Sequence, residues 1–86
     1  MPEVKIGEVV KFFAKPSVAA IVITDIGLKI GNTIRIKGHT TDLTEMVESM
    51  QINNQSVGEA KVRDDVGIKV KDRVRPGDMV YLVTEG

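Results

Sequence analysis

The sequence predicts a single all-β domain folded as a closed or nearly closed antiparallel barrel. Its apolar residues are mostly Val and Ile in short runs, and Gly, Pro, Asn or Asp interrupts these runs about every ten residues, as in sandwiches and barrels. The three-and-four-residue spacing of an amphipathic helix is nearly absent. A chain of 86 residues has room for only one hydrophobic core, so we expect residues 1–86 to form one domain.

The first expected element is a long hairpin. Its strands span residues 4–15 and 17–24 and meet at Pro16, because proline cannot donate to a strand ladder and is tolerated at a turn or an edge. The next strand, 33–37, has the clearest pattern, since apolar and charged residues alternate strictly along it. Its apolar side chains should face the core and its charged ones the solvent.

A longer strand is expected from 43 to 53, although its alternation slips. Val47 follows one parity and Met50 the opposite one, and a β-bulge at 48–49 would bring both to the same face. A helix over 43–50 is the alternative, because apolar residues in this stretch are also spaced three and four apart.

The remaining residues are expected to complete the sheet. Residues 53–63 are polar and indicate a loop. Residues 65–73 are predicted to form a strand, and 75–78 a turn of type II, with Pro and Gly at its two central positions. The last strand is 79–83.

Composition and motifs argue against enzyme chemistry. The chain has 12 basic and 12 acidic residues, no Cys and one His, so disulfides and thiolate or His-rich metal sites are excluded. No phosphate-binding Gly-rich loop and no Ser-His-acid set is present. We expect no catalytic residues, no metal and no cofactor.

The N-terminal residues lack a signal pattern. The longest apolar run, Val18 to Ile23, is far shorter than the roughly 20 residues that span a bilayer. We therefore expect a cytoplasmic protein with no membrane partner.

A row of basic residues is the candidate nucleic-acid surface. Its members alternate along the strand predicted at 65–73 and just beyond it, and they are Lys69, Lys71, Arg73 and Arg75. If the strand persists, they line one face and could follow a phosphate backbone. The alternative is a solvated face whose charges prevent edge-to-edge pairing.

Two adjacent phenylalanines indicate a second apolar face. Phe12 and Phe13 must point to opposite sides of a strand, and the neighbouring strand around Ile21 is apolar on both faces. Either the chain covers the outer face itself, or that face binds a protein partner or a second copy. Phe12, Phe13 and Ile21 are the candidate docking residues.

Several segments, in this order, resemble the second domain of translational GTPases such as elongation factor Tu. They are Gly7 to Phe12, Leu28 to Gly38, Glu48 to Ile52, Asp65 to Ile68 and Arg75 to Asp78. The resemblance implies a small six-stranded, Greek-key-like barrel of the translation-factor second-domain type. It implies no GTP hydrolysis and no bound nucleotide, because the domain that binds GTP in that family is not in this sequence.

In that family the barrel contacts the aminoacyl end of tRNA. Carried over by position, the contacting residues fall on Gly7, Glu8, Ser49, Gln51 and Asp65. Glu8 and Asp65 keep comparable chemistry. The resemblance thus implies a remnant ligand face at Glu8, Gln51 and Asp65.

Two functions are expected from the sequence. The first is a non-catalytic translation-factor-like module that binds tRNA, rRNA or a translation-associated protein. The second is an accessory protein-interaction barrel that docks onto a separately encoded enzyme, because the chain also resembles the accessory barrel of some collagenase-like peptidases. The second apolar face is also a candidate surface for dimerisation.

Overall fold

The structure is a computed structural model that describes residues 3–84. All regular secondary-structure elements in this range are strands. The strands are β1 (Glu3–Phe13), β2 (Val18–Ile23), β3 (Leu28–Lys29), β4 (Thr33–Lys37), β5 (Asp42–Met46), β6 (Met50–Ile52), β7 (Gln55–Val57), β8 (Glu59–Ala60), β9 (Asp65–Lys69) and β10 (Met79–Val83). The all-β prediction is confirmed. Within the described residues, no helix is long and apolar enough to cross a membrane.

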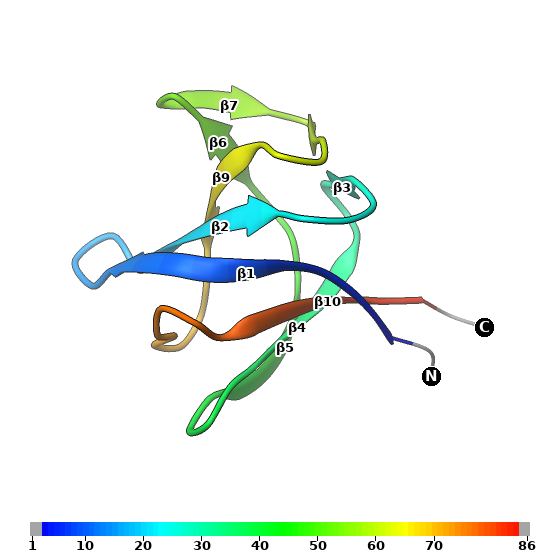
Figure 1. Cartoon of the computed structure of the whole chain (residues 1–86). Coiled ribbons are helices and arrows are strands. Elements are labelled where there is room, and N and C mark those ends of the chain that lie inside the picture. The colour runs from blue at the N-terminus through cyan, green and yellow to red at the C-terminus, as the bar shows by residue number, and fades with distance from the viewer. Residues whose placement is uncertain (1–2, 85–86) are drawn as a thin grey trace.

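Eight of these strands form one antiparallel sheet in the order β5-β4-β10-β1-β2-β9-β6-β7, and β3 pairs with β8 beside it. Figure 1 shows how the sheet curves, with β7 and β5 at opposite ends. The prediction of a closed, six-stranded barrel is wrong, because the sheet has eight strands and two edges that do not pair with each other.

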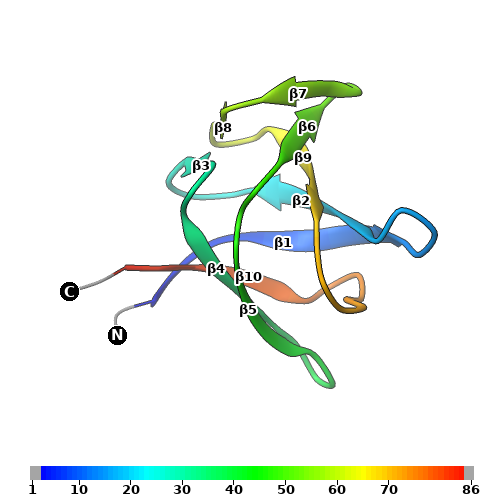
Figure 2. The ribbon, with the colours of Figure 1, turned by 180° about the vertical axis from the view of Figure 1, so that it is seen from behind.

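Two connections on the open side of the curved sheet are not strands. Residues 47–49 lead from β5 to β6, and residues 70–78 lead from β9 to β10 (Figure 2). Just after β9, the Lys71 N–H donates to the Glu45 carboxylate of β5 at 3.0 Å, although β5 and β9 do not pair. We call this contact between β5 and residues 70–74 the seam.

The core fills the inside of the curved sheet and follows the predicted alternation. Ile34 and Ile36 of β4 are fully buried, as expected for strand 33–37. The other buried apolar residues are Ile6, Val9, Ala19, Ile21, Ile23, Leu28, Val47, Met50, Ala60, Val66, Ile68, Val70, Val74 and Val80. Each fully buried Val, Leu, Ile or Met contributes roughly 1.5–3 kcal/mol relative to an exposed position.

Ile21 is therefore not a docking residue. It is 0% exposed, because alternation along β2 directs Ala19, Ile21 and Ile23 into the core and leaves Val18, Ala20 and Val22 half-buried on the outer face.

The two adjacent phenylalanines of β1 face opposite sides, as predicted, and a bulge before them sets which one faces inward. The register against β2 shifts between Val9 and Lys11, which places an extra residue on β1. Phe12 packs against the core, whereas Phe13 is 43% exposed. The outward docking candidate is thus Phe13.

The strand predicted at 43–53 is interrupted, and the helix considered for 43–50 does not form. β5 ends at Met46 and β6 begins at Met50. Val47 and Met50 are both buried, while residues 48–49 are both exposed. Because two successive residues are exposed, the inward-facing positions change from odd-numbered to even-numbered residues. The predicted change in alternation is confirmed, and it occurs at a break between β5 and β6 in place of the expected bulge.

Two other predicted boundaries are also wrong. The expected loop 53–63 contains β7 and β8, and the expected strand 65–73 ends at Lys69. Beyond Lys69 the chain bends, so that Val70 and Val74 are buried with three exposed residues between them.

Candidate ligand groove on the outer face of the sheet

A groove crosses the outer face of β2, β9 and β6. Its larger part is a hollow of about 440 Å³, lined by Phe13, Pro16, Val18, Ala20, Gln51, Asn53, Asn54, Asp65, Val66 and Gly67. A second hollow of about 350 Å³ continues it and is lined by Pro16, Val18, Ser49, Gln51, Gly67 and Lys69. Because the two hollows share four residues, we treat them as one feature, the outer groove.

The floor of the outer groove is low because its central residues are small. Gly67 of β9 lies between Ala20 of β2 and Gln51 of β6 in the ladder. A Cβ atom added at Gly67 would lie 3.2 Å from Cγ1 of Val18. Any larger residue at position 67 would therefore fill the groove and press against its wall.

One wall is apolar and comes from the β1–β2 hairpin. Phe13 and Pro16 are exposed, and Val18 is half-buried. The Lys11 ammonium lies 5.0 Å from the centre of the Phe13 ring, a cation–π contact that helps to hold the ring in place. An aromatic ring and a proline ring at a groove edge offer flat, rigid apolar surface to a ligand.

The opposite wall is polar and comes from β6 and its turn. Asn53 and Asn54 have φ angles of +53° and +64°, as the two central residues of a two-residue hairpin turn require. Asn accepts this conformation more readily than most residues. The turn thus presents two amide side chains beside Gln51, and all three residues are exposed.

The outer groove carries opposite charges at its two ends. Asp65 and Lys69 lie on the same outward face of β9, four positions apart, with the Gly67 floor between them. At the strand rise of about 3.3 Å per residue, their Cα atoms are about 13 Å apart. Neither side chain has an ion-pair partner among residues 3–84.

The structure brings together candidates that the sequence assigned to separate surfaces. Phe13, Gln51 and Asp65 line the groove with Lys69. Glu8 lies outside it, on the same outer row as Asp65 with Val22 between them in the ladder. The amide turn at 53–54 was missed, and the available signal was that Asn tolerates the positive φ of a turn.

The predicted basic row does not form one continuous face. Lys69 borders the outer groove, and Lys71 borders the seam beside Glu45. Arg73 and Arg75 line a separate hollow of about 330 Å³ with Lys11 and Phe12.

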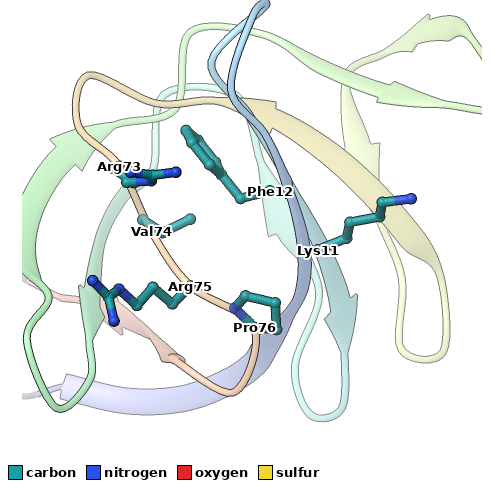
Figure 3. A pocket seen from close by; sticks show the side chains of 6 residues that line it. All are labelled: Lys11, Phe12, Arg73, Val74, Arg75 and Pro76. Carbon is teal, nitrogen blue, oxygen red and sulfur yellow. The ribbon is translucent and has the colours of Figure 1, made fainter.

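Figure 3 shows the basic side chains of that separate hollow diverging. The Arg73 guanidinium lies beside Phe12, while Arg75 and Lys11 extend in opposite directions away from the hollow. The alternation on which the row depended does not continue, because β9 ends at Lys69 and residues 71–73 are exposed in succession. The arrangement gives no converging set of cations for an anion.

The seam contains a charged group that sequence analysis missed. Glu45 is 6% exposed, and its Oε1 atom is buried with no hydrogen-bond partner in the described structure. Burial raises the pKa of the Glu45 carboxyl, and the N–H of Lys71 partly opposes this by donating to Oε2. A Glu between the inward residues Leu43 and Val47 was the available signal.

No metal centre is indicated in the range 3–84, where no three His, Cys, Asp or Glu side chains gather closely enough to hold an ion.

Comparison with known proteins shows which proteins this chain resembles. No family model matches the chain. An uncharacterized protease of Methanocaldococcus jannaschii is 49% identical over 84 residues, which are 96% of this chain and 20% of the relative. A collagenase of Porphyromonas gingivalis is 34% identical over 80 residues, 92% of this chain and 19% of the relative. The chain thus spans about a fifth of the length of these relatives.

A solved structure confirms the fold type. The crystal structure of the C-terminal domain of a Geobacillus thermoleovorans protein assigned to the U32 peptidases has a TM-score of 0.86. It is 17% identical, and the match covers 93% of this chain and 92% of that domain. The selenomethionine form of the same domain gives a TM-score of 0.82.

The chain is similar to one segment of collagenase-like peptidases. The inferred kinship with elongation factor Tu is wrong, because the relatives are a protease and a collagenase, and the structural neighbour is a peptidase domain. The translation-related role and the RNA-binding role derived from that kinship lose their basis. The other resemblance, to the accessory barrel of collagenase-like peptidases, is the one that the comparisons support.

Proposed function

We propose that this chain is a non-catalytic accessory domain of a collagenase-like peptidase and that it contacts the catalytic part of the enzyme through the outer groove. The observation that carries the proposal is the 49% identity over 96% of the chain to a protease of which it matches only 20%. Four-fifths of that relative lies outside the match and has room for a catalytic domain.

The chemistry of the outer groove supports a binding role. Its lining is apolar and amide side chains, with one carboxylate and one ammonium group at opposite ends. The one histidine of the sequence, His39, is exposed in the turn between β4 and β5 and belongs to a different part of the sheet. A nucleophile in the groove would therefore have no imidazole beside it.

The apolar wall supports a protein partner. Exposed Phe13 and Pro16, next to half-buried Val18, form an apolar centre with polar residues around it. Protein interfaces commonly have this composition, with an aromatic anchor inside a polar rim.

The test uses three forms of the P. gingivalis collagenase: the intact protein, a form without the matched 80-residue segment, and a chimera with this chain in its place. We expect the deletion to lower collagen cleavage and the chimera to restore much of it. Phe13→Ala in the chimera should remove most of the gain, whereas Ile26→Ala, at an equally exposed apolar residue away from the groove, should not.

Two results would contradict the proposal. One is a deletion form as active as the intact enzyme, which would leave the segment without an accessory role. The other is collagen cleavage by this chain alone, which would make it catalytic.

A further inference from the structure

The two charges of the outer groove define what kind of segment fits it. Asp65 and Lys69 project from one face of β9, and Gly67 between them has no side chain. Ligand atoms can therefore reach the sheet between the charges without displacing a side chain. A flat protein surface cannot enter such a channel, whereas a single extended segment can.

The channel is continuous along β9. Asn53 and Asn54 stand with Asp65 in the larger hollow, and Ser49 and Pro16 stand with Lys69 in the smaller one. Gln51, opposite Gly67 in the ladder, borders both. The channel therefore runs from an acidic end with amides to a basic end with a hydroxyl.

We infer that the outer groove binds an extended segment of the peptidase's catalytic part that carries a basic and an acidic side chain four positions apart. The basic side chain pairs with Asp65 and the acidic one with Lys69. This inference rests on the proposed function, and it adds the chemistry of the partner segment.

The spacing follows from backbone geometry. An extended strand rises about 3.3 Å per residue and a polyproline II segment about 3.1 Å, so side chains at i and i+4 are about 12–13 Å apart. This matches the separation of Asp65 and Lys69 along β9. The segment can run in either direction, because only the distance between its two charges is fixed.

Nearby carboxylates leave the basic end of the groove available. Lys69 also borders the hollow at the seam, where Glu45 and Glu48 lie. Glu45 accepts the Lys71 N–H there, and no ion pair joins Lys69 to either carboxylate in the described structure.

The experiment is an NMR titration of the ¹⁵N-labelled chain with four synthetic ten-residue peptides of Ala, Thr and Pro. They carry Lys-x₃-Glu, Lys-x₃-Lys, Glu-x₃-Glu or adjacent Lys-Glu. We expect Lys-x₃-Glu to shift the amide signals of Ala20, Gln51 and Gly67 and to bind most tightly. Each mismatched charge should weaken binding about five-fold, as an exposed ion pair of up to ~1 kcal/mol implies.

Charge reversal in the groove gives a stricter test. Asp65→Lys makes both ends basic and should transfer the preference to Glu-x₃-Glu. Lys69→Glu makes both ends acidic and should transfer it to Lys-x₃-Lys. Both positions are exposed, so both variants should fold and the exchange of preference should be measurable.

A side chain added at the floor of the outer groove supplies a further comparison. Gly67→Val should abolish binding of all four peptides, while Gly58→Val, where an added Cβ meets no atom within 4 Å, should leave it unchanged. If Gly67→Val fails to fold, the charge-reversal variants still decide the question.

Several results would overturn the inference. They are equal binding of all four peptides, no shift at Gly67, or unchanged preference in the charge-reversal variants.

The catalytic part of the collagenase, prepared without the matched segment, should displace the Lys-x₃-Glu peptide. If gelatin fragments displace the peptide and the catalytic part does not, the groove binds substrate and the inference is overturned. The chimeric collagenase assay judges the accessory role separately, so the two proposals can fail independently.

Discussion

Glu45 is a charged residue at a position where strand alternation calls for an apolar one. It lies on the inward face of β5 beside Leu43 and Val47, and only one of its carboxylate oxygens has a hydrogen-bond donor in the described structure. Burial raises the pKa of this carboxyl, because the ionised form loses hydration. The folded chain therefore binds this proton more tightly than the unfolded chain does.

The sign of the pH dependence follows from that shift. The stabilising contribution of protonated Glu45 is fully present below its ordinary pKa of 4.5 and is lost as pH rises through the higher folded value. We predict that Glu45→Gln raises Tm at pH 7, since the amide oxygen still accepts the Lys71 N–H without a buried charge. A gain of ~1 kcal/mol corresponds to about 4–8 °C, and the gain should shrink at pH 4.

Thermal unfolding at both pH values measures this effect, with Glu48→Gln at an exposed neighbouring position as the control. A lower Tm for Glu45→Gln at pH 7 would show that the ionised carboxylate stabilises the seam by more than its burial costs.

At the scale of elements, three turns use the same hydrogen bonds. They span 29–32, 61–64 and 75–78. In each, the side-chain oxygen of the fourth residue accepts the N–H of the first at 2.8–2.9 Å. The N–H of the fourth residue donates to the carbonyl of the first at 2.9–3.1 Å. Asn or Asp at the fourth position is therefore a requirement of the turn.

The third residue of each turn has positive φ, as a type II turn requires. Gly31 and Gly77 have φ of +95°, which confirms the turn predicted at 75–78. This chemistry also explains the mistaken kinship with elongation factor Tu. Leu28 to Asn32 and Arg75 to Asp78 were among the segments that suggested it, and both contain turn residues that many unrelated strand connections use.

Arg63 occupies the same position in the turn 61–64, with φ of +78°. A non-glycine residue there costs about 1–2 kcal/mol, while glycine adds about 0.4–1 kcal/mol of freedom to the unfolded chain. We predict that Arg63→Gly increases the free energy of unfolding by roughly 0.5–1 kcal/mol, measured by denaturant titration. The matched control, Gly77→Arg, should decrease it. A destabilising Arg63→Gly would mean that the Arg63 side chain makes a compensating contact.

Sequence patterns predicted the strands in which apolar and polar residues alternate. They missed the short strands that are defined only by their backbone pairing with a neighbouring strand. Strand 33–37 was predicted because Ile34 and Ile36 alternate with charged residues. β7 (Gln55–Val57) and β8 (Glu59–Ala60) are mostly exposed. Such strands form because a neighbouring strand satisfies their backbone groups, and a local pattern carries little sign of this.

At the scale of the whole molecule, closure was not predictable from local pattern. Whether the two ends of a sheet pair depends on contacts between residues far apart in sequence, here between β5 and β7, and these two strands do not pair. The outer groove has the same origin, since Phe13, Gln51 and Asp65 belong to three different strands or their ends. Sequence analysis assigned Gln51 and Asp65 to one ligand face and did not indicate that Phe13 meets them.

The open sheet predicts unequal stability across the molecule. Residues 70–74 are held by the Glu45–Lys71 contact at the seam and by Ser17, whose hydroxyl donates to the Val70 carbonyl at 2.7 Å and whose carbonyl accepts the Val70 N–H at 2.9 Å. The central strands β10, β1 and β2 each have paired neighbours on both sides. Segments with few hydrogen bonds to the rest of the fold open at lower free energy.

We predict that amide hydrogen exchange is slowest in β1, β2 and β10 and faster in residues 70–74, β5 and β7. Ser17→Ala should speed exchange in 70–74 by several-fold, because a hydrogen bond contributes about 0.5–1.5 kcal/mol, and should leave β10 unchanged. Exchange followed by NMR measures both effects. Equal protection in all eight strands of the sheet would contradict the prediction, because it would mean that the two ends of the sheet are held as firmly as its centre.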